Sequence, residues 1–147
     1  MEKDPIIILT EDDVGHAGLI LSSLKYAGIT SDILCFENGE DTLDFLFKRG
    51  KRPYREDGVL YVLLLDIRLP GIDGTEVLHR VKNDKWINKI PVIMLSVSDN
   101  PEEIEKCRKL GCDNYFVKHT TYEKFNLTVE QLGLYLNNVL FPGIAEA

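Results

Sequence analysis

Four short apolar runs of the sequence are each followed by residues that could take part in phosphate or metal chemistry. Residues 6–9 precede Glu11, Asp12 and Asp13, residues 59–65 precede Asp66, residues 92–95 precede Ser96, and residues 115–117 precede Lys118. Carboxylate oxygens are ligands that Mg²⁺ and Mn²⁺ prefer, and a carboxylate can also act as a nucleophile. A lysine ammonium and a serine hydroxyl can stabilise negative charge on phosphoryl oxygens. These residue types together predict metal-assisted phosphoryl transfer.

A cluster of carboxylates has a physical requirement of its own. Two carboxylates about 5 Å apart repel each other by roughly 3 kcal/mol at an effective dielectric near 20, so a cation must lie among them. Singly, each residue has a more ordinary explanation, since an Asp after a strand often caps a helix, a Ser forms a turn and a Lys is a solvated charge. Four such positions after four different runs favour the chemical interpretation.

Strand-like runs alternate with helical stretches along the chain, which is the pattern of a parallel sheet covered on both faces. We expect strands at residues 6–9, 32–36, 59–65, 92–95 and 115–117. The predicted fold class is α/β, with a flavodoxin-like, doubly wound sheet of five parallel strands in the order 2-1-3-4-5 and five helices. The first, third, fourth and fifth strands are then neighbours, so the polar residues at their carboxyl ends converge on one pocket.

Signals for helices follow the strands: a cap at Asp12 or Asp13, a stretch at 40–48, a start near Thr75, a cap at Asn100 and a stretch at 122–140. The fourth helix has the clearest start, with Pro101 at its first position and Glu103 three residues after the Asn100 cap, in the capping-box pattern. We expect one domain over residues 1–147, with a core of about 6–140, an extended solvated loop at 49–58 and a short tail at 141–147.

The composition argues against several classes of function. The net charge of −7 and the pI near 4.9 disfavour direct nucleic-acid binding. The longest apolar run, 59–65, is far shorter than the roughly 20 residues that span a bilayer, and no secretory signal is visible. Three cysteines without disulfide or metal spacing suit reduced thiols, and the scattered histidines His16, His79 and His119 are weak candidates for catalysis. We therefore expect a cytoplasmic protein without membrane contact.

Four segments resemble the response regulator receiver family of bacterial two-component systems, over about residues 6–140. They are IIILTEDD at 6–13, VLLLDIRLPGIDG at 62–74, PVIMLS at 91–96 and DNYFVK at 113–118. The resemblance implies a phosphorelay in which a sensor histidine kinase donates a phosphoryl group to an aspartate with the help of Mg²⁺ or Mn²⁺. It also implies a phosphoprotein switch that is not a turnover enzyme, apart from slow hydrolysis of its own aspartyl phosphate.

The resemblance assigns roles to individual residues. It implies a metal site formed by Glu11, Asp12, Asp66 and the backbone carbonyl of Arg68. It implies Asp66 as the phosphoacceptor, with Ser96 and Lys118 binding the phosphoryl group. Tyr115 would be the aromatic switch residue, turning inward as Ser96 moves toward the phosphate, and the reshaped surface would be the face of the fourth helix, fifth strand and fifth helix.

Two positions depart from the family's usual pattern. His119 follows the lysine where receivers usually have a proline after a cis peptide bond, and a cis bond without proline costs about 3 kcal/mol or more. The direction of the Lys118 side chain is therefore an open point. Val97 follows Ser96 where the family usually has a smaller residue, and we expect it to narrow access to the phosphoryl site.

A narrower resemblance is to the single-domain response regulators that pair with bacterial phytochromes, particularly those of cyanobacteria. It covers the extended loop, the tail and the absence of an output domain. It implies a phytochrome as the kinase partner and a homodimer through the face of the fourth and fifth helices. Leu134 and Phe141 lie off the apolar stripe of the last helix and are the candidate dimer contacts.

Three other functions remain as alternatives. A phosphatase with an aspartyl nucleophile needs a second acid two residues after the nucleophile, where this chain has Arg68. A flavodoxin-like cofactor binder needs a phosphate-binding loop after the first strand, where the acidic residues 11–13 would repel phosphate. A degenerate receiver that only binds partners is disfavoured by the presence of Asp66, Ser96 and Lys118.

Overall fold

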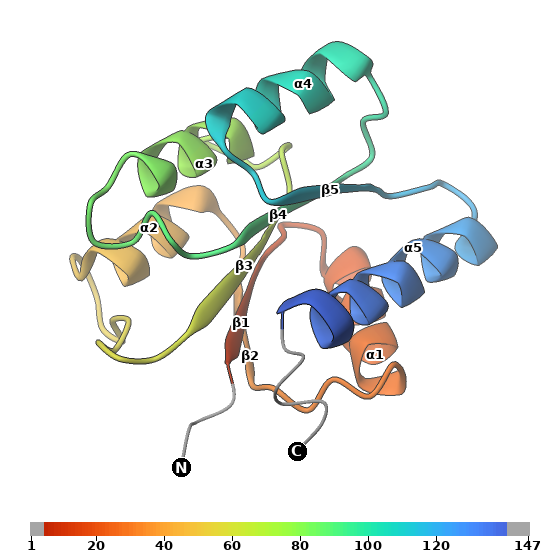
Figure 1. The fold of residues 1–147 in the computed structure, drawn as a ribbon, viewed down its shortest axis with the longest axis horizontal. Helices are drawn as coiled ribbons and strands as arrows, with labels where there is room; N and C mark the ends of the chain where they lie inside the picture. Colours follow the sequence, from red (N-terminus) through yellow and green to blue (C-terminus); the bar gives the residue numbers. More distant parts are fainter. Residues whose placement is uncertain (1–4, 141–147) are drawn as a thin grey trace.

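The computed structural model describes residues 5–140, which form one sheet with helices on both faces (Figure 1). The strands are β1 (Ile6–Thr10), β2 (Ile33–Phe36), β3 (Tyr61–Leu65), β4 (Val92–Ser96) and β5 (Asn114–Val117). The helices are α1 (Val14–Tyr26), α2 (Gly39–Phe47), α3 (Gly74–Lys82), α4 (Pro101–Leu110) and α5 (Tyr122–Tyr135), which continues as the π-helical turn η1 (Leu136–Leu140). Within residues 5–140, no helix combines the length and apolar character required to cross a bilayer.

The strands are parallel and lie in the order β2-β1-β3-β4-β5, which confirms the predicted α/β, flavodoxin-like sheet. Each strand ends within two residues of its predicted limits. The largest difference is at β3, which begins at Tyr61 rather than at Val59, because Leu60 is exposed and only its carbonyl bonds to β1 through the N–H of Ile6. The predicted last helix changes its hydrogen-bond pattern at Leu136, where η1 begins.

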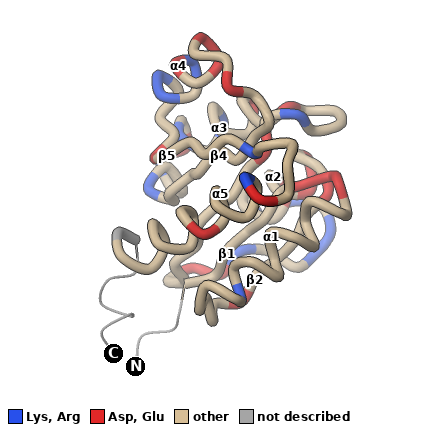
Figure 2. Tube along the Cα trace, turned by 90° about the vertical axis from the view of Figure 1, so that its right-hand side faces the viewer, with Lys and Arg blue, Asp and Glu red and all other residues tan. Residues whose placement is uncertain are grey.

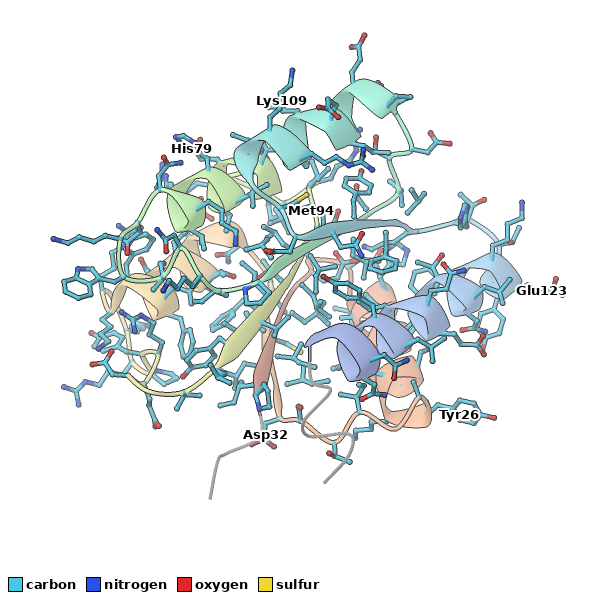
Figure 3. The ribbon with its side chains drawn as sticks, viewed as in Figure 1. Tyr26, Asp32, His79, Met94, Lys109 and Glu123 are labelled. Carbon is cyan, nitrogen blue, oxygen red and sulfur yellow. The ribbon has the colours of Figure 1, made fainter. Side chains whose placement is uncertain are left out.

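Two apolar layers hold the sheet between its helices. Successive residues of a strand point to opposite faces, so Ile8 joins the cluster beneath α2, α3 and α4, whereas Ile7 and Leu9 join the cluster beneath α1 and α5. Met94 belongs to the first cluster and lies in the interior near the middle of the sheet, while Tyr26 projects into solvent from the end of α1 (Figure 3). The two buried faces explain why the inner strands β1, β3 and β4 are nearly continuous apolar runs.

A side-chain cap begins each of the five helices among residues 5–140. The accepting residues are Asp13, Asn38, Asp73, Asn100 and Thr121. The Asn100 cap was predicted, but the capping box was not formed: the Asn100 side chain accepts from the Glu102 N–H, and the Glu103 carboxylate instead accepts the Ser98 hydroxyl at 2.5 Å. Glu103 is therefore turned toward the loop that follows β4, where its carboxylate accepts a charge-assisted hydrogen bond.

Gly74 at the start of α3 lies against the backbone of the residues that follow β3. Its N–H donates to the Ile67 carbonyl at 2.8 Å, and a Cβ at this position would overlap the carbonyl oxygen of Asp66 and the Cα of Ile67. The close approach explains why the GIDG turn precedes the helix: only glycine lets α3 begin this near to Asp66.

We predict that Gly74→Ala lowers the free energy of unfolding by about 2 kcal/mol, because the overlap is with backbone that cannot move aside without shifting Asp66. Urea unfolding followed by circular dichroism measures the change. Gly18→Ala is the matched control, since Gly18 lies in α1 with open space around it, and there the same substitution should raise stability by about 1 kcal/mol. Equal effects at both glycines would contradict the close approach.

The predicted loop at 49–58 is mostly exposed but is tied to the body of the molecule. The Arg55 guanidinium donates to the Leu46 carbonyl at 2.7 Å, and the Glu56 N–H donates to the Tyr61 hydroxyl at 2.9 Å. The loop shares a surface depression with Trp86, which lies on the connection from α3 to β4 and is 75% exposed. This depression is at the amino ends of the strands, opposite the carboxyl ends that carry the acidic residues.

Candidate functional site

The carboxyl ends of β1, β3, β4 and β5 meet along one edge of the sheet. Thr10 pairs with Leu65, so Glu11 and Asp66 are the first residues after the neighbouring strands β1 and β3. Ser96 pairs with Val117, the last residue of β5. Lys118 follows β5, and its backbone N–H donates to the Ser96 carbonyl at 2.6 Å. The order of the strands therefore brings four distant parts of the chain to one place, as predicted.

Lys118 is the centre of this arrangement. Its ammonium lies 2.6 Å from Glu11 Oε1 and 3.0 Å from Asp66 Oδ2, and its side chain is almost fully buried. A buried ammonium needs such partners, since an isolated charge would lose its hydration without compensation. The lysine thus offsets part of the repulsion between the two carboxylates, and the predicted meeting of Glu11, Asp66 and Lys118 is confirmed.

The Lys118 side chain reaches the pocket without a cis peptide bond before His119. Among residues 5–140, the one cis peptide bond joins Arg52 to Pro53, so the Lys118–His119 bond is trans. His119 itself is exposed. With His119 in place of the proline, the Lys118 ammonium still reaches the carboxylates of Glu11 and Asp66.

Glu11, Asp12 and Asp66 each place a carboxylate oxygen within 4.8 Å of the others. Glu11 is buried, Asp66 is 9% exposed and Asp12 is exposed. Glu11 Oε2 is a buried oxygen that has no hydrogen-bond partner among the described residues. An orphaned carboxylate oxygen beside two further carboxylates fits a small divalent cation, because oxygen ligands from a few carboxylates are what Mg²⁺ and Mn²⁺ take in proteins.

The electrostatic strain of the cluster shows in Glu11. Burial and the neighbouring Asp66 carboxyl raise the pKa of Glu11 to about 8, although Lys118 acts in the opposite direction. The Lys118 ammonium therefore does not outweigh the burial of this carboxyl. A bound divalent cation would favour its ionised form.

Ser96 and Tyr115 lie on the two strands beside the acidic cluster. Ser96 is fully buried at the end of β4, and its hydroxyl accepts from the Ser98 N–H at 3.3 Å. The Tyr115 ring packs against the cluster beneath α3 and α4, and its hydroxyl donates to the Ser98 carbonyl at 2.7 Å. Tyr115 therefore already occupies an inward, hydrogen-bonded position. Val97, between the two serines, is 47% exposed at the rim.

Arg68 contributes backbone and side chain at different places. Its N–H donates to Asp66 Oδ1 at 3.3 Å, and its guanidinium extends outward to 3.8 Å from Glu103 Oε2. Glu103, which also accepts the Ser98 hydroxyl, was predicted only as a capping residue. Glu103 reaches Ser98 and Arg68 because the start of α4 lies close to the carboxyl ends of β3 and β4. Helix-start signals in the sequence do not reveal this placement.

His16 is the second residue that sequence reasoning missed. Its Nδ1 lies 3.1 Å from Glu11 Oε1, at the inner side of the acidic cluster. The histidines were set aside because their spacing matches no metal site. The available signal was different: a position three residues after the Asp13 cap lies in the first helical turn and faces back toward the strand end.

Leu134, the dimer candidate that the structure describes, lies on α5. Leu134 is 60% exposed on the outer side of α5, in keeping with its predicted position off the apolar stripe, whereas Leu132 and Leu136 are buried. Phe141 lies outside the described residues.

Comparisons with known proteins agree with this geometry. A family model for the response regulator receiver domain matches residues 7–130. The probable methanogenesis regulatory protein FilR2 of Methanothrix harundinacea is 32% identical over 136 residues, covering 90% of this chain and 84% of FilR2.

Two crystal structures extend the likeness to three dimensions. A response regulator receiver domain from Rhodospirillum rubrum superposes with a TM-score of 0.82 at 33% identity, covering 91% of this chain and 94% of that one. The phosphorylated cyanobacterial phytochrome response regulator RcpA superposes with a TM-score of 0.81 at 26% identity, covering 90% of this chain and 94% of that one. The likeness to cyanobacterial phytochrome regulators is thus confirmed, and by its fold, strand-end residues and family match the chain belongs to the response regulator receiver domain family.

Proposed function

We propose that this chain accepts a phosphoryl group on Asp66 from a phosphohistidine of a sensor kinase and acts as a switch in a two-component phosphorelay. The observation that carries the proposal is the Lys118 ammonium held between Glu11 and Asp66 in a pocket with an orphaned carboxylate oxygen. This set of groups supplies a nucleophile, a fixed cation and metal ligands at one place. Phosphoryl transfer needs these groups for positioning and charge stabilisation.

The residues of the pocket divide the reaction among them. An Asp66 carboxylate oxygen attacks phosphorus, the P–N bond to the donor imidazole breaks, and the imidazole leaves with the bonding electron pair. Lys118 lies where it can turn from Asp66 Oδ2 to an equatorial phosphoryl oxygen, and the Ser96 hydroxyl is the proposed donor to another. Glu11, Asp12, Asp66 and the Arg68 carbonyl would hold Mg²⁺ or Mn²⁺, and the chemistry that such a cation supplies is neutralisation of phosphoryl charge.

We infer that the signal leaves through the surface of α4, β5 and α5. Ser96 is the last residue of β4, Tyr115 lies on β5, and both bond to Ser98 just before α4. A phosphoryl group that pulls on the Ser96 hydroxyl therefore displaces the loop that accepts the Tyr115 hydroxyl. This surface carries charges of both signs along α4 (Figure 2), with acidic residues in its first turn and basic residues in its last, which suits a protein partner better than nucleic acid.

We do not expect turnover on free phosphoesters. An aspartyl phosphatase has an acid two residues after its nucleophile, and here that residue is Arg68, whose guanidinium extends toward Glu103. Slow hydrolysis of the chain's own aspartyl phosphate is the expected end of each signal.

The proposed donor is a histidine kinase, and a phytochrome is the favoured one. The support is the likeness to RcpA, which is named as a phytochrome response regulator. FilR2 is named for methanogenesis regulation, so the kinase must be identified by phosphotransfer. Short incubations with an autophosphorylated phytochrome kinase and with an unrelated histidine kinase separate the two possible phosphoryl donors. We expect rapid transfer from the phytochrome and slower transfer from the unrelated kinase. Because a kinase of this kind draws on ATP inside the cell, the proposal places the chain in the cytoplasm.

Acetyl phosphate labelling tests the proposed function. We expect intact-mass spectrometry at acidic pH to show one added phosphoryl group when the protein is incubated with acetyl phosphate and Mg²⁺, and none when EDTA replaces the metal. Mn²⁺ should substitute for Mg²⁺ because the ligands are carboxylate oxygens. Absence of labelling with either metal, from acetyl phosphate and from kinase alike, would favour the degenerate receiver that only binds partners.

We propose in addition that the chain forms a homodimer through the face that includes α5. Leu127 and Leu134 are 57% and 60% exposed and lie seven residues apart, so they share one side of the helix.

We predict that Leu134→Glu converts the dimer to a monomer, because a carboxylate would lose its hydration in the interface. Light scattering after size exclusion measures the mass. Leu60→Glu, at an exposed leucine remote from α5, should leave the dimer intact, and a Leu134→Glu dimer would remove this face from consideration.

A further inference from the structure

The two oxygens of the Glu11 carboxylate have different surroundings. Oε1 receives the Lys118 ammonium at 2.6 Å and His16 Nδ1 at 3.1 Å. Oε2 is buried and has no hydrogen-bond partner among the described residues. Two hydrogen-bond contacts on the same oxygen fix the rotation of the carboxyl group and leave the other oxygen free.

The His16 ring is itself held in place on two sides. The first turn of α1 fixes its backbone, since the His16 N–H donates to the Asp13 cap at 3.0 Å. Its ring lies against the Phe125 ring of α5, with 5.8 Å between centroids, and Phe125 is buried. The imidazole therefore bridges α1 and α5 at the level of Glu11, with its Nδ1 directed to Oε1.

The contact does not depend on the charge of His16. A neutral imidazole can carry its proton on Nδ1, and an imidazolium carries protons on both nitrogens, so Nδ1 can donate in either form. When Glu11 is ionised, as it is when it binds a cation, its carboxylate can only accept, and the proton of the contact then lies on Nδ1. In that state of Glu11, His16 is the donor.

We infer that His16 is a positioning residue that orients Glu11 for the cation, an inference that rests on the metal site of the proposed function. Among the described residues, the carboxylates of Glu11, Asp12 and Asp66 form the group of candidate ligands, and His16 lies outside that group. Its place is behind a ligand, where hydrogen bonds fix the orientation of ligand side chains. Losing such a partner typically weakens metal affinity by about 10- to 100-fold.

Two substitutions separate orientation from packing. His16→Phe keeps a ring against Phe125 and removes the donor, whereas His16→Asn places an amide nitrogen close to the position of Nδ1. We expect His16→Phe to bind Mn²⁺ about 10-fold more weakly than the wild type and His16→Asn to stay within a factor of about three. His79→Phe, at an exposed histidine on α3, should not change the affinity.

The measurement is the electron paramagnetic resonance signal of free Mn²⁺ during titration of each protein. A second readout is the Mg²⁺ concentration that gives half-maximal acetyl phosphate labelling, which should rise for His16→Phe while the rate at saturating Mg²⁺ stays the same. His16→Leu serves as a second donor-free variant if His16→Phe folds poorly by circular dichroism. If the donor-free variants bind Mn²⁺ as tightly as the wild type, the role of His16 is overturned and the metal site stands. If the wild type binds no Mn²⁺, both the metal site and the role of His16 are overturned.

Discussion

Asp66→Asn is expected to abolish phosphoryl labelling from acetyl phosphate and Mg²⁺ completely. An amide nitrogen or oxygen is too weak a nucleophile to replace the carboxylate, while the shape of the side chain is unchanged. The variant should fold, because it removes one charge from beside Glu11, a carboxyl whose pKa burial and the neighbouring Asp66 raise to about 8. Intact-mass spectrometry at acidic pH detects the label, and circular dichroism checks the fold.

The matched control for this experiment is Asp99→Asn. Asp99 is an exposed aspartate on the connection from β4 to α4, close in sequence to the rim of the pocket. Its substitution should leave labelling at the wild-type level. If Asp66→Asn were labelled to the same extent as Asp99→Asn, the acceptor would have to be another residue.

Lys118→Met should lower the free energy of unfolding by about 3 kcal/mol in the absence of divalent metal. The substitution leaves Glu11 and Asp66 close together in a buried place with their shared cation removed. Saturating Mg²⁺ should restore part of the loss, because the cation binds only the folded chain and takes over part of the charge compensation. Urea unfolding with EDTA and with Mg²⁺ gives the two values.

Lys109→Met is the corresponding surface control. Lys109 lies on the outer side of α4, exposed to solvent (Figure 3), and its loss should change stability by about 0.5 kcal/mol at most. Labelling of Lys118→Met by acetyl phosphate should also be slow, because no ammonium then meets the phosphoryl charge. Unchanged stability in EDTA would mean that Glu11 and Asp66 need no cation between them, which would contradict the central contact of the site.

The sheet could be predicted from the sequence because its three inner strands, β1, β3 and β4, are buried on both faces. Runs such as residues 92–95 have no polar position, so they fit no amphipathic helix of that length, and each is followed by helix-start chemistry. The ends of elements were less certain, as at Leu60, because an exposed leucine next to an apolar run cannot be told from a strand residue by type alone. The change of hydrogen-bonding at Leu136 has no sequence signal that we can identify.

The core of the site followed from the predicted strand order, since Glu11, Asp66 and Lys118 each follow a strand directly. The roles given to them, and to Asp12, Ser96, Tyr115 and the Arg68 carbonyl, stay predictions until labelling and metal binding are measured. The residues that were missed, His16 and Glu103, lie on helices whose first turns face the pocket. Their contacts depend on how α1 and α4 are placed on the sheet, and a one-dimensional pattern carries little of that placement.

The location of Trp86 has a practical consequence for anyone who wishes to follow this protein optically. It is the single tryptophan of the chain, it is largely exposed, and it lies at the amino ends of the strands whereas Asp66 lies beyond their carboxyl ends. Its emission should therefore be almost unaffected by a paramagnetic ion or by phosphorylation at the far edge of the sheet. A tryptophan introduced at Val97, on the rim beside Ser96, would place a fluorophore where quenching can report both events.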